Sequence, residues 1–461
     1  MVSRTFKGGL ALPEYKNTKD QKIEYFASPE TLCIPMNQHV GRPARPIVVP
    51  GEHVRRGQRI ALADGELSAD IHTAVSGTVT GIQTKTDASG RSVLHVVIQN
   101  DFQNELFETV KPVDKRISEM SSTEIIEIVK NAGIVGMGGA MFPTHVKLAS
   151  AVGRTERLII NCAECEPYLT SNHRLLLENT AAIIGGTKII MRALGVYHAD
   201  FAVENNKRNA IAKLKQLCKG RPDLFNVHSL KTKYPQGDER QLIYALYRKK
   251  LPVGKLPIDA GCVVFNAETV FAIYNAFAKG MPLCERVVTV DGDCISNPKC
   301  IRVPIGTPYI DLFRFCGGLC KVPREIICGG PMMGVSQWDA ETPVIKGTTG
   351  VLAFSGFQNQ TQTRVPTCIR CGRCVNICPM RLMPNYLVSY AKSGDTKTCR
   401  ALYAQSCVEC GLCSYYCPGD MPIVQYIRII KAKIKEEDTF KALSTKRTEP
   451  VLTDKRGDDP R

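Results

Sequence analysis

Residues 367–380 read TCIRCGRCVNICPM, with four cysteines separated by two, two and three residues and a proline directly after the last one. The same spacing returns in residues 406–419, SCVECGLCSYYCPG. Three thiolates placed two residues apart can bind three corners of one iron–sulfur cubane, while the fourth lies beyond a turn. The two runs therefore predict a domain that folds around two [4Fe–4S] clusters.

Bacterial two-cluster ferredoxins have this spacing, and in them the fourth cysteine of each run binds the other cluster. Cluster I is therefore expected at Cys368, Cys371, Cys374 and Cys417. Cluster II is expected at Cys378, Cys407, Cys410 and Cys413. Paired cysteines also build four-thiolate zinc sites, which are the alternative, although two identical triplet-plus-one runs suit clusters better.

Charged residues within the runs distinguish the two clusters. Arg370 and Arg373 lie between the ligands of cluster I, and Glu409 lies between those of cluster II. Nearby positive charge favours the reduced, more negative cluster. We therefore expect cluster I to have the higher reduction potential.

The composition limits where the chain works and what it binds. No apolar run is long enough to span a membrane, and the start, MVSRTFKGGLALPEYK, lacks the apolar core of a signal peptide, so we expect a cytoplasmic location. In that reducing compartment the 20 cysteines serve metal or redox chemistry rather than disulfides. The net charge of +16 falls to roughly +12 if two oxidised clusters carry about −2 each. No basic stripe with interleaved aromatics is present, so no nucleic-acid partner is expected.

A glycine-rich segment, IVGMGGAMFPTHVK at residues 134–147, lies between a predicted helix (122–133) and a predicted strand, RLIIN at 157–161. Glycines let the backbone approach a phosphate and aim N–H groups at it, and Lys147 adds positive charge. A turn of purely geometric role is the alternative. The strand leads into NCAECEPYLTSNHR, with Asn161, Glu164 and Glu166 at the carboxyl end, where α/β folds bind ligands.

Several motifs together resemble a known family. The segment GGAMFPT, a following lysine and Asn-x-x-Glu-x-Glu-Pro resemble the flavin- and NADH-binding subunit of respiratory complex I. Closer still is the resemblance to the RnfC family, the C subunits of Rnf ion-translocating oxidoreductase complexes, over roughly residues 1–435. It is carried by GMGGAMFPTHVK, NCAECEPYLTSNHRLL, ERVVTVDG, CGGPMMG and the two cysteine runs, in this order.

The resemblance implies non-covalent FMN and an NAD(H) site in one Rossmann-like domain. Residues along the flavin's phosphate and ribityl chain would be Gly136, Gly138, Gly139 and Lys147, with Asn161, Glu164, Asn266 and Thr269 in the same cofactor site. Residues near the nicotinamide nucleotide would be Phe142, Glu166, Asp238 and Glu239. Ordinary solvated carboxylates are the alternative for Glu166 and Glu239. No catalytic residue is assigned, because a flavin itself takes a hydride and releases electrons singly.

The expected fold class is a multi-domain chain of α/β and α+β parts. Residues 1–115 form a barrel-sandwich (lipoyl-like) domain, unmodified because the tip segment 64–70 holds no lysine. Residues 116–284 form the Rossmann-like FMN/NADH domain, 285–356 a β-grasp (SLBB-like) domain, and 357–440 a helical two-[4Fe–4S] ferredoxin-type domain. In the last domain Ile423, Ile427, Ile430 and Ile434 share one face of a predicted helix. Residues 441–461 are expected to be a disordered tail.

The predicted function is that of an NAD(H)-dependent oxidoreductase subunit of translocase type. It would pass electrons between two [4Fe–4S] clusters, FMN and NAD(H), peripherally at the cytoplasmic face of the bacterial inner membrane. Its partners would be the other Rnf subunits, which move Na⁺ or H⁺ and connect it indirectly to ferredoxin. The alternatives are a soluble flavin/iron–sulfur reductase on the same scaffold, such as a cobalamin reductase, and an electron conduit without nucleotide turnover.

The cysteines outside the two runs are expected to be buried free thiols, since cysteine packs as a small hydrophobe. They include Cys162 and Cys165, which form a CxxC pair, and the group Cys294, Cys300, Cys316, Cys320 and Cys328. A third metal site or a redox dithiol is the alternative.

Overall fold

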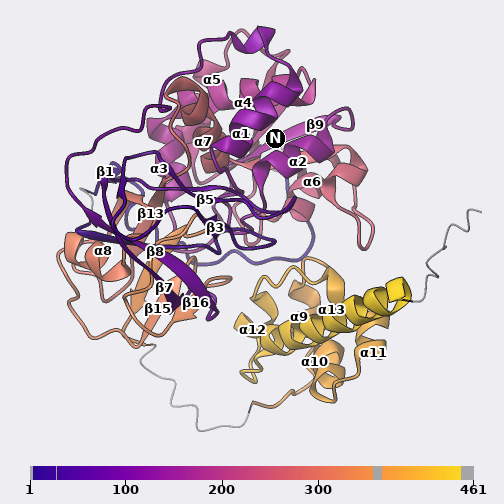
Figure 1. The fold of residues 1–461 in the computed structure, drawn as a ribbon. Helices are drawn as coiled ribbons and strands as arrows, with labels where there is room; N and C mark the ends of the chain where they lie inside the picture. The colour runs from indigo at the N-terminus through magenta and orange to yellow at the C-terminus, as the bar shows by residue number, and fades with distance from the viewer. Residues whose placement is uncertain (1–3, 27–28, 357–365, 448–461) are drawn as a thin grey trace, which may run out of the picture. The chain divides into compact units, whose positions relative to one another are not determined.

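The computed structural model describes residues 4–26, 29–356 and 366–447 and divides into two compact units, Met1–Thr361 and Gln362–Arg461 (Figure 1). Each unit has its own hydrophobic core. Short 3₁₀ turns occur at Ile117–Glu119, Pro257–Ala260 and Ala404–Ser406. Within the described ranges, none of the helices combines the length and the apolar character that a bilayer crossing requires.

The first domain of the N-terminal unit is built from two small antiparallel sheets. One has the order β2 (Thr31–Pro35), β8 (Ser92–Asn100), β7 (Gly77–Thr86) and β4 (His53–Val54). The other has β3 (Arg45–Pro46), β5 (Arg59–Leu62) and β6 (Ile71–His72). Apolar residues at alternate positions of β2 and β8, among them Leu32, Ile34, Val96 and Ile98, are fully buried between the sheets.

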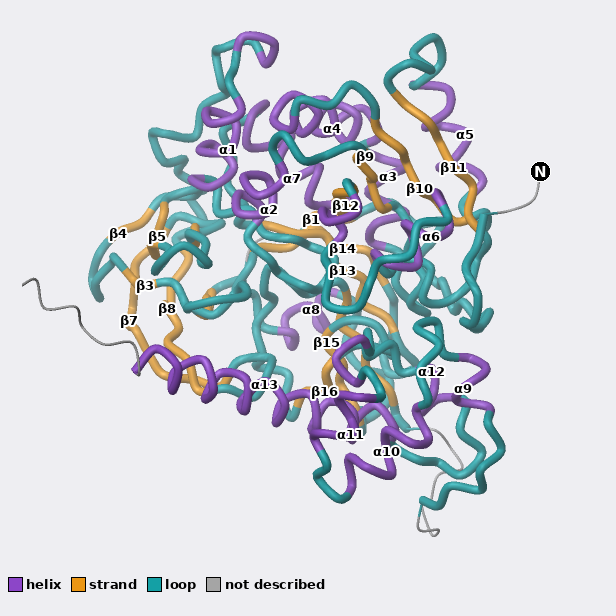
Figure 2. The backbone as a smooth tube through the Cα atoms, turned by 90° about the vertical axis from the view of Figure 1, so that its right-hand side faces the viewer, coloured by secondary structure: helices purple, strands orange, loops and turns teal. Residues whose placement is uncertain are grey.

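The second domain contains a parallel sheet in the order β11 (Phe225–Leu230), β10 (Ala199–Glu204), β9 (Arg157–Asn161) and β12 (Cys262–Asn266). The strands β9, β10 and β12 are almost entirely buried because helices cover both faces, whereas the edge strand β11 is partly exposed. One face packs on α4 (Thr180–Leu194) and α7 (Ala267–Ala278), which lie together in Figure 2, and the other on α6 (Glu239–Tyr247). The remaining helices are α1 (Ser122–Asn131), α2 (Thr144–Ala151), α3 (Ser171–Glu178) and α5 (Arg208–Leu217).

The strand order of this sheet creates a switch point. The chain forms β9, then β10 and β11 on one side, and returns to add β12 on the other side of β9. β9 and β12 are therefore neighbours in the sheet although two other strands separate them in the chain. Open α/β sheets bind ligands in the crevice at such a point.

The third domain has a mixed sheet with one helix, α8 (Tyr309–Phe315), packed into its core. Its strands are β1 (Glu24–Tyr25), β14 (Lys299–Pro304), β13 (Glu285–Asp291), β17 (Gly350–Phe354), β15 (Glu325–Cys328) and β16 (Val335–Gln337), in that order. The pairs β13–β17 and β1–β14 are parallel. The pairs β13–β14, β15–β17 and β15–β16 are antiparallel. This mixed arrangement matches the expected β-grasp.

The first described residues also contact the second and third domains. Residues 4–26, named here the N-terminal strap, make bridges from Arg4 to Leu230 and from Leu10 to Tyr234 in the second domain. The strap then adds β1 to the edge of the third domain's sheet. Its few apolar residues cannot build a core alone, so it is stabilised by pairing with strand edges and loops of two neighbours.

The C-terminal unit is helical. It consists of α9 (Arg373–Ile377), α10 (Pro384–Lys392), α11 (Thr396–Ala401), α12 (Leu412–Tyr415) and α13 (Ile423–Arg447). Ile423, Ile427, Ile430 and Ile434 are buried together in its core, which confirms the predicted apolar face.

The prediction of a disordered tail from residue 441 is wrong for 441–447, which continue α13. The chain from Ile423 to Arg447 contains neither glycine nor proline and is rich in lysine and isoleucine, so nothing local ends the helix. Residues 448–461 of the predicted tail lie outside the described residues.

Candidate functional site

Two asparagines end the strands at the switch point. Asn161 closes β9 and Asn266 closes β12, and the two residues are paired in the sheet register. The Asn266 side chain accepts the Glu268 N–H at 2.9 Å and so caps α7. The Asn161 side chain donates to the Gly237 carbonyl at 2.8 Å. The sequence-predicted pair therefore lies side by side at the carboxyl edge of the sheet.

The glycine-rich segment folds into a closed loop against this edge. The Gly136 N–H donates to the Phe142 carbonyl at 2.9 Å, and Gly138 packs on the Asn266 side chain. Gly139 has φ +100° and open space where a Cβ would lie, a conformation that favours glycine. The Thr269 hydroxyl accepts the Met137 N–H at 2.9 Å. The loop precedes the sheet in the chain, yet it lies directly on the switch point.

The buried ion pair Arg286–Glu268 contacts the glycine-rich loop at Met137. The Arg286 Nη2 lies 2.7 Å from a Glu268 carboxylate oxygen and donates to the Met137 carbonyl at 3.4 Å. Arg286 also donates to the Lys346 carbonyl, and the other Glu268 oxygen accepts the Val287 N–H at 2.7 Å. Burial raises the pKa of Glu268, and the Arg286 guanidinium opposes this shift.

Sequence reasoning missed this ion pair, although Arg286 lies in the motif ERVVTVDG and Glu268 lies between the candidate residues Asn266 and Thr269. An arginine inside an otherwise apolar strand is the signal that could have revealed it, because a buried charge requires a partner.

Lys147 and the segment before α6 meet on the same side of the sheet. The Lys147 Nζ lies 2.8 Å from a Glu239 oxygen and 5.3 Å from the Phe265 ring centroid. The Asp238 carboxylate caps α6 by accepting the Arg240 and Gln241 N–H groups at 3.1 Å each. Burial raises the pKa of Asp238 to about 6. Lys147 and Glu239 are half-exposed and accessible to a ligand, whereas Asp238 already serves its helix.

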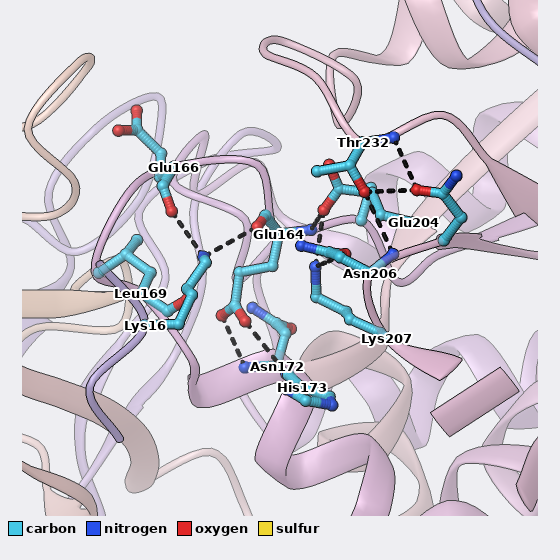
Figure 3. Close-up of polar contacts among 12 residues, drawn as sticks. Lys16, Glu164, Glu166, Leu169, Asn172, His173, Glu204, Asn206, Lys207 and Thr232 are labelled. Carbon is cyan, nitrogen blue, oxygen red and sulfur yellow. Dashed lines mark hydrogen bonds and ion pairs between the residues drawn. The ribbon is translucent and has the colours of Figure 1, made fainter. Parts of the chain in front are cut away.

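The two glutamates of the turn after β9 have different surroundings (Figure 3). The Glu164 carboxylate is buried and accepts the N–H groups of Asn172 and His173, at 2.9 and 3.2 Å, at the start of α3. Burial works to raise the pKa of Glu164, but Lys16 and Lys207 outweigh it and hold the pKa below its usual value. The structure thus gives Glu164 a helix-capping position rather than an open one.

Glu166 points toward the third domain instead. Its two oxygens accept the N–H groups of Met332 and Met333 at 2.9 and 3.0 Å. Burial raises the pKa of Glu166 to about 7. The loop that contains CGGPMMG, which sequence reasoning used only as a family motif, therefore borders the predicted nucleotide site.

The cysteine runs come together in the C-terminal unit. Cys368, Cys371 and Cys374 of the first run line one pocket with Cys417 of the second run. Cys378 of the first run lies within electrostatic range of Cys407 and Cys413. Each set thus combines three thiols of one run with the fourth thiol of the other.

The described thiols do not converge on a single metal ion. Across residues 4–26, 29–356 and 366–447, no three His, Cys, Asp or Glu side chains converge closely enough to hold a single metal ion. A cubane is bound at four separate corners, so its thiolates lie farther apart than four ligands around one zinc ion. The first set is also more open, since Cys368 and Cys371 are exposed whereas Cys410 and Cys413 are buried.

The sequence indicates more positive charge around cluster I than around cluster II. In the structure this difference between the two cysteine sets is smaller. Glu409 pairs with Arg428 at 3.0 Å and with Lys431, both on α13. Lys431 also donates to the Cys407 carbonyl at 2.8 Å. The surroundings of the second set therefore carry net positive charge, which the run alone does not reveal.

Most of the remaining cysteines fit the expectation of buried thiols. Cys162, Cys294, Cys300 and Cys316 are buried, and burial raises the pKa of Cys162 to about 12. Cys165 and Cys328 are partly buried, and Cys320 is exposed, contrary to the expectation.

Models of four protein families match the chain in order. They are the RnfC barrel sandwich hybrid domain at residues 4–103, the Nuo51 FMN-binding domain at 129–275, the SLBB domain at 287–336 and a 4Fe–4S dicluster domain at 367–422. The four expected domain types are thereby confirmed.

Known proteins that match most of this chain are C subunits of ion-translocating oxidoreductase complexes. The C subunit of the Na⁺-translocating ferredoxin:NAD⁺ oxidoreductase complex of Acetobacterium woodii is 40% identical, and the match covers 93% of this chain and 97% of the relative. The C subunit of the proton-translocating complex of Clostridium ljungdahlii is 40% identical over 93% of this chain and 94% of its own. The C subunit of the ion-translocating oxidoreductase complex of Rhodobacter capsulatus is 38% identical over 96% and 85%.

Proposed function

Because the chain belongs to the family of C subunits of Rnf-type ion-translocating oxidoreductase complexes, we propose that it is the NAD-side electron-transfer subunit of such a complex. It contains an FMN-binding domain and a 4Fe–4S dicluster domain. The observation that carries the proposal is the meeting of the glycine loop, Asn161 and Asn266 at the switch point.

The residues at the switch point fit a flavin nucleotide. The glycine loop leaves open space at Gly139, and Lys147 supplies a nearby positive charge for a phosphate. Asn161 and Asn266 offer amide groups at the strand ends. Bound FMN supplies the conversion between hydride and single-electron transfer.

The nicotinamide nucleotide is proposed to bind beside this loop, near Phe142, Glu166 and Glu239. Glu239 fits this role because it is half-exposed and paired with Lys147. Glu164 and Asp238, which cap helices α3 and α6, hold the turns in place and are not proposed as direct ligands.

The two thiol sets are proposed as the cluster ligands. Cys368, Cys371, Cys374 and Cys417 hold cluster I, and Cys378, Cys407, Cys410 and Cys413 hold cluster II. The pocket that the first set lines and the proximity of Cys378 to the second run support this crossed arrangement.

We further propose that the partners are the other subunits of the complex, that electrons come from ferredoxin through them, and that they move the ion. The chain would then lie peripherally on the cytoplasmic face of the membrane. Co-purification of the tagged chain with solubilised membranes supports membership, whereas recovery solely from the soluble fraction favours a free reductase.

The decisive experiment is anaerobic mixing of the cluster- and FMN-loaded chain with NADH, while flavin and iron–sulfur absorbance are followed together. Bleaching of both chromophores supports a nucleotide–flavin–cluster path in this chain. If flavin and clusters are present but NADH bleaches neither, the proposal is wrong and the chain is an electron conduit.

A further inference from the structure

The N-terminal strap crosses the carboxyl edge of the parallel sheet. Leu10 exchanges two backbone hydrogen bonds with Tyr234, at 3.0 and 2.8 Å. The Glu14 carbonyl accepts the Tyr168 N–H at 2.9 Å, and the Tyr15 ring stacks on the Tyr168 ring with centroids 5.1 Å apart. The strap thus contacts the turn that contains Glu166 and the segment that leads into α6, a helix that begins at Glu239.

Lys16 extends from the strap into the turn after β9 (Figure 3). Its ammonium donates to the Glu164 carbonyl at 3.0 Å, to the Glu166 carbonyl at 2.7 Å and to the Leu169 carbonyl. An ammonium has three N–H donors, so this one turn uses all of them. Burial lowers the pKa of Lys16, and the charge of Glu164 opposes that shift.

The same turn is held from its other side by the third domain. The Glu166 carboxylate accepts the Met332 and Met333 N–H groups, and a Cβ on Gly330 would lie only 2.4 Å from it. Gly330 must therefore stay glycine for the carboxylate to reach this loop. Lys16 fixes the backbone of the turn while the loop fixes the side chain of Glu166.

We propose that Lys16 is a positioning residue of the nucleotide site and acts through the turn that carries Glu166. The inference rests on the proposed function, because it gives Glu166 its role beside the nucleotide. Without the ammonium, three inward-facing carbonyls lose their donor, and the turn must rearrange to satisfy them. Glu166 then moves, and the affinity for the nucleotide falls. All three donors of Lys16 go to the turn after β9, and the cluster ligands belong to the other compact unit, so FMN and iron should stay bound.

The test compares variants of the full, cofactor-loaded chain in NADH oxidation with ferricyanide as acceptor. Lys16→Met should raise KM for NADH at least tenfold and change kcat less than twofold, with FMN and iron contents unchanged. Lys19→Met is the matched control, because Lys19 is an exposed lysine three positions further along the same strap. Its KM should equal that of the wild type. Ethylammonium added to Lys16→Ala should lower the raised KM, since the cation can enter the vacated position.

Hydrogen exchange of the amides in residues 164–169 gives a readout without turnover. Faster exchange in Lys16→Met together with the raised KM supports the inference. An unchanged KM overturns it, and so does loss of FMN or iron from Lys16→Met, because the role is then general stability. If the wild type itself does not oxidise NADH, the proposed function fails and the inference fails with it. If the wild type oxidises NADH and Lys16→Met does so with the same KM, only the inference fails.

Discussion

Replacing Arg286 by methionine should destabilise the N-terminal unit strongly. The Arg286 side chain is 0% exposed and that of its partner Glu268 is 2% exposed, so solvent cannot compensate either charge. Methionine retains much of the side-chain volume but donates no hydrogen bond. Glu268 would remain as a buried carboxylate without its cation, and the Met137 and Lys346 carbonyls would lose a donor.

The magnitude follows from this burial. Removal of one partner of a buried ion pair costs about 3–5 kcal/mol, largely because the remaining charge is uncompensated. The double variant Glu268→Met/Arg286→Met removes that charge as well, so we expect it to recover most of the loss. Arg314 is the matched control: its side chain is 72% exposed and pairs with Asp311, so Arg314→Met should cost at most about 1 kcal/mol.

The loss should depend on pH. Burial raises the pKa of Glu268, and Arg286 opposes this, so removing Arg286 raises the pKa of Glu268 further. A raised carboxyl pKa means that the folded state binds the proton more tightly than the unfolded chain, and stability falls as pH rises. The deficit of Arg286→Met should therefore be smaller at about pH 5.5 than at about pH 8.

The assay is urea denaturation of the FMN-loaded chain, followed by flavin fluorescence at both pH values. The loop residue Met137 contacts Arg286, so the flavin signal reports on the affected region. Two results would refute the reasoning. One is an Arg286→Met variant within about 1 kcal/mol of the wild type, below the range for a broken buried pair. The other is a double variant no more stable than the single one.

Three further predictions concern the turn after β9 and the clusters. Because the pKa of Glu166 is raised to about 7, the wild type should lose stability relative to Glu166→Gln between about pH 5 and about pH 7; a constant difference in Tm across this range contradicts the shift. Cys417→Ser should remove the EPR signal of cluster I and about half of the iron, whereas Cys378→Ser should remove that of cluster II. If each variant instead loses the cluster of its own run, the crossed ligand sets are wrong. Lys431→Met removes a positive charge beside Cys407. The midpoint potential of cluster II should then fall by about 20–40 mV in an EPR redox titration. This shift corresponds to roughly 0.5–1 kcal/mol, as expected for a half-buried charge. An unchanged potential would show that this charge is screened.

The sequence predicted features whose signal is local. Cluster ligands are held by short turns, so the spacing of Cys368, Cys371 and Cys374 identifies them directly. The isoleucines of α13 repeat every three or four residues, and the burial of that face follows from helix geometry. The glycine loop was recognised because glycine is needed at a position such as Gly139, where φ is positive.

The sequence does not reveal a role that depends on what packs against a residue. Glu164 and Glu166 are two positions apart, yet Glu164 caps α3 and Glu166 reaches the loop at Met332. Glu409 suggested a negatively charged cluster, but Arg428 and Lys431 of α13 pair with it.

The sequence by itself determined the family, the kinds of domain and the two cysteine runs, because each is encoded within a few neighbouring residues. Only the tertiary structure decided which backbone groups the buried charges contact. Lys16 lies 148 residues from Glu164, and Arg286 lies 149 residues from Met137. Such contacts leave no periodic pattern in the chain. The strength of these contacts depends on the exclusion of water. That exclusion is set by the packing of the domains within the N-terminal unit and not by either residue alone.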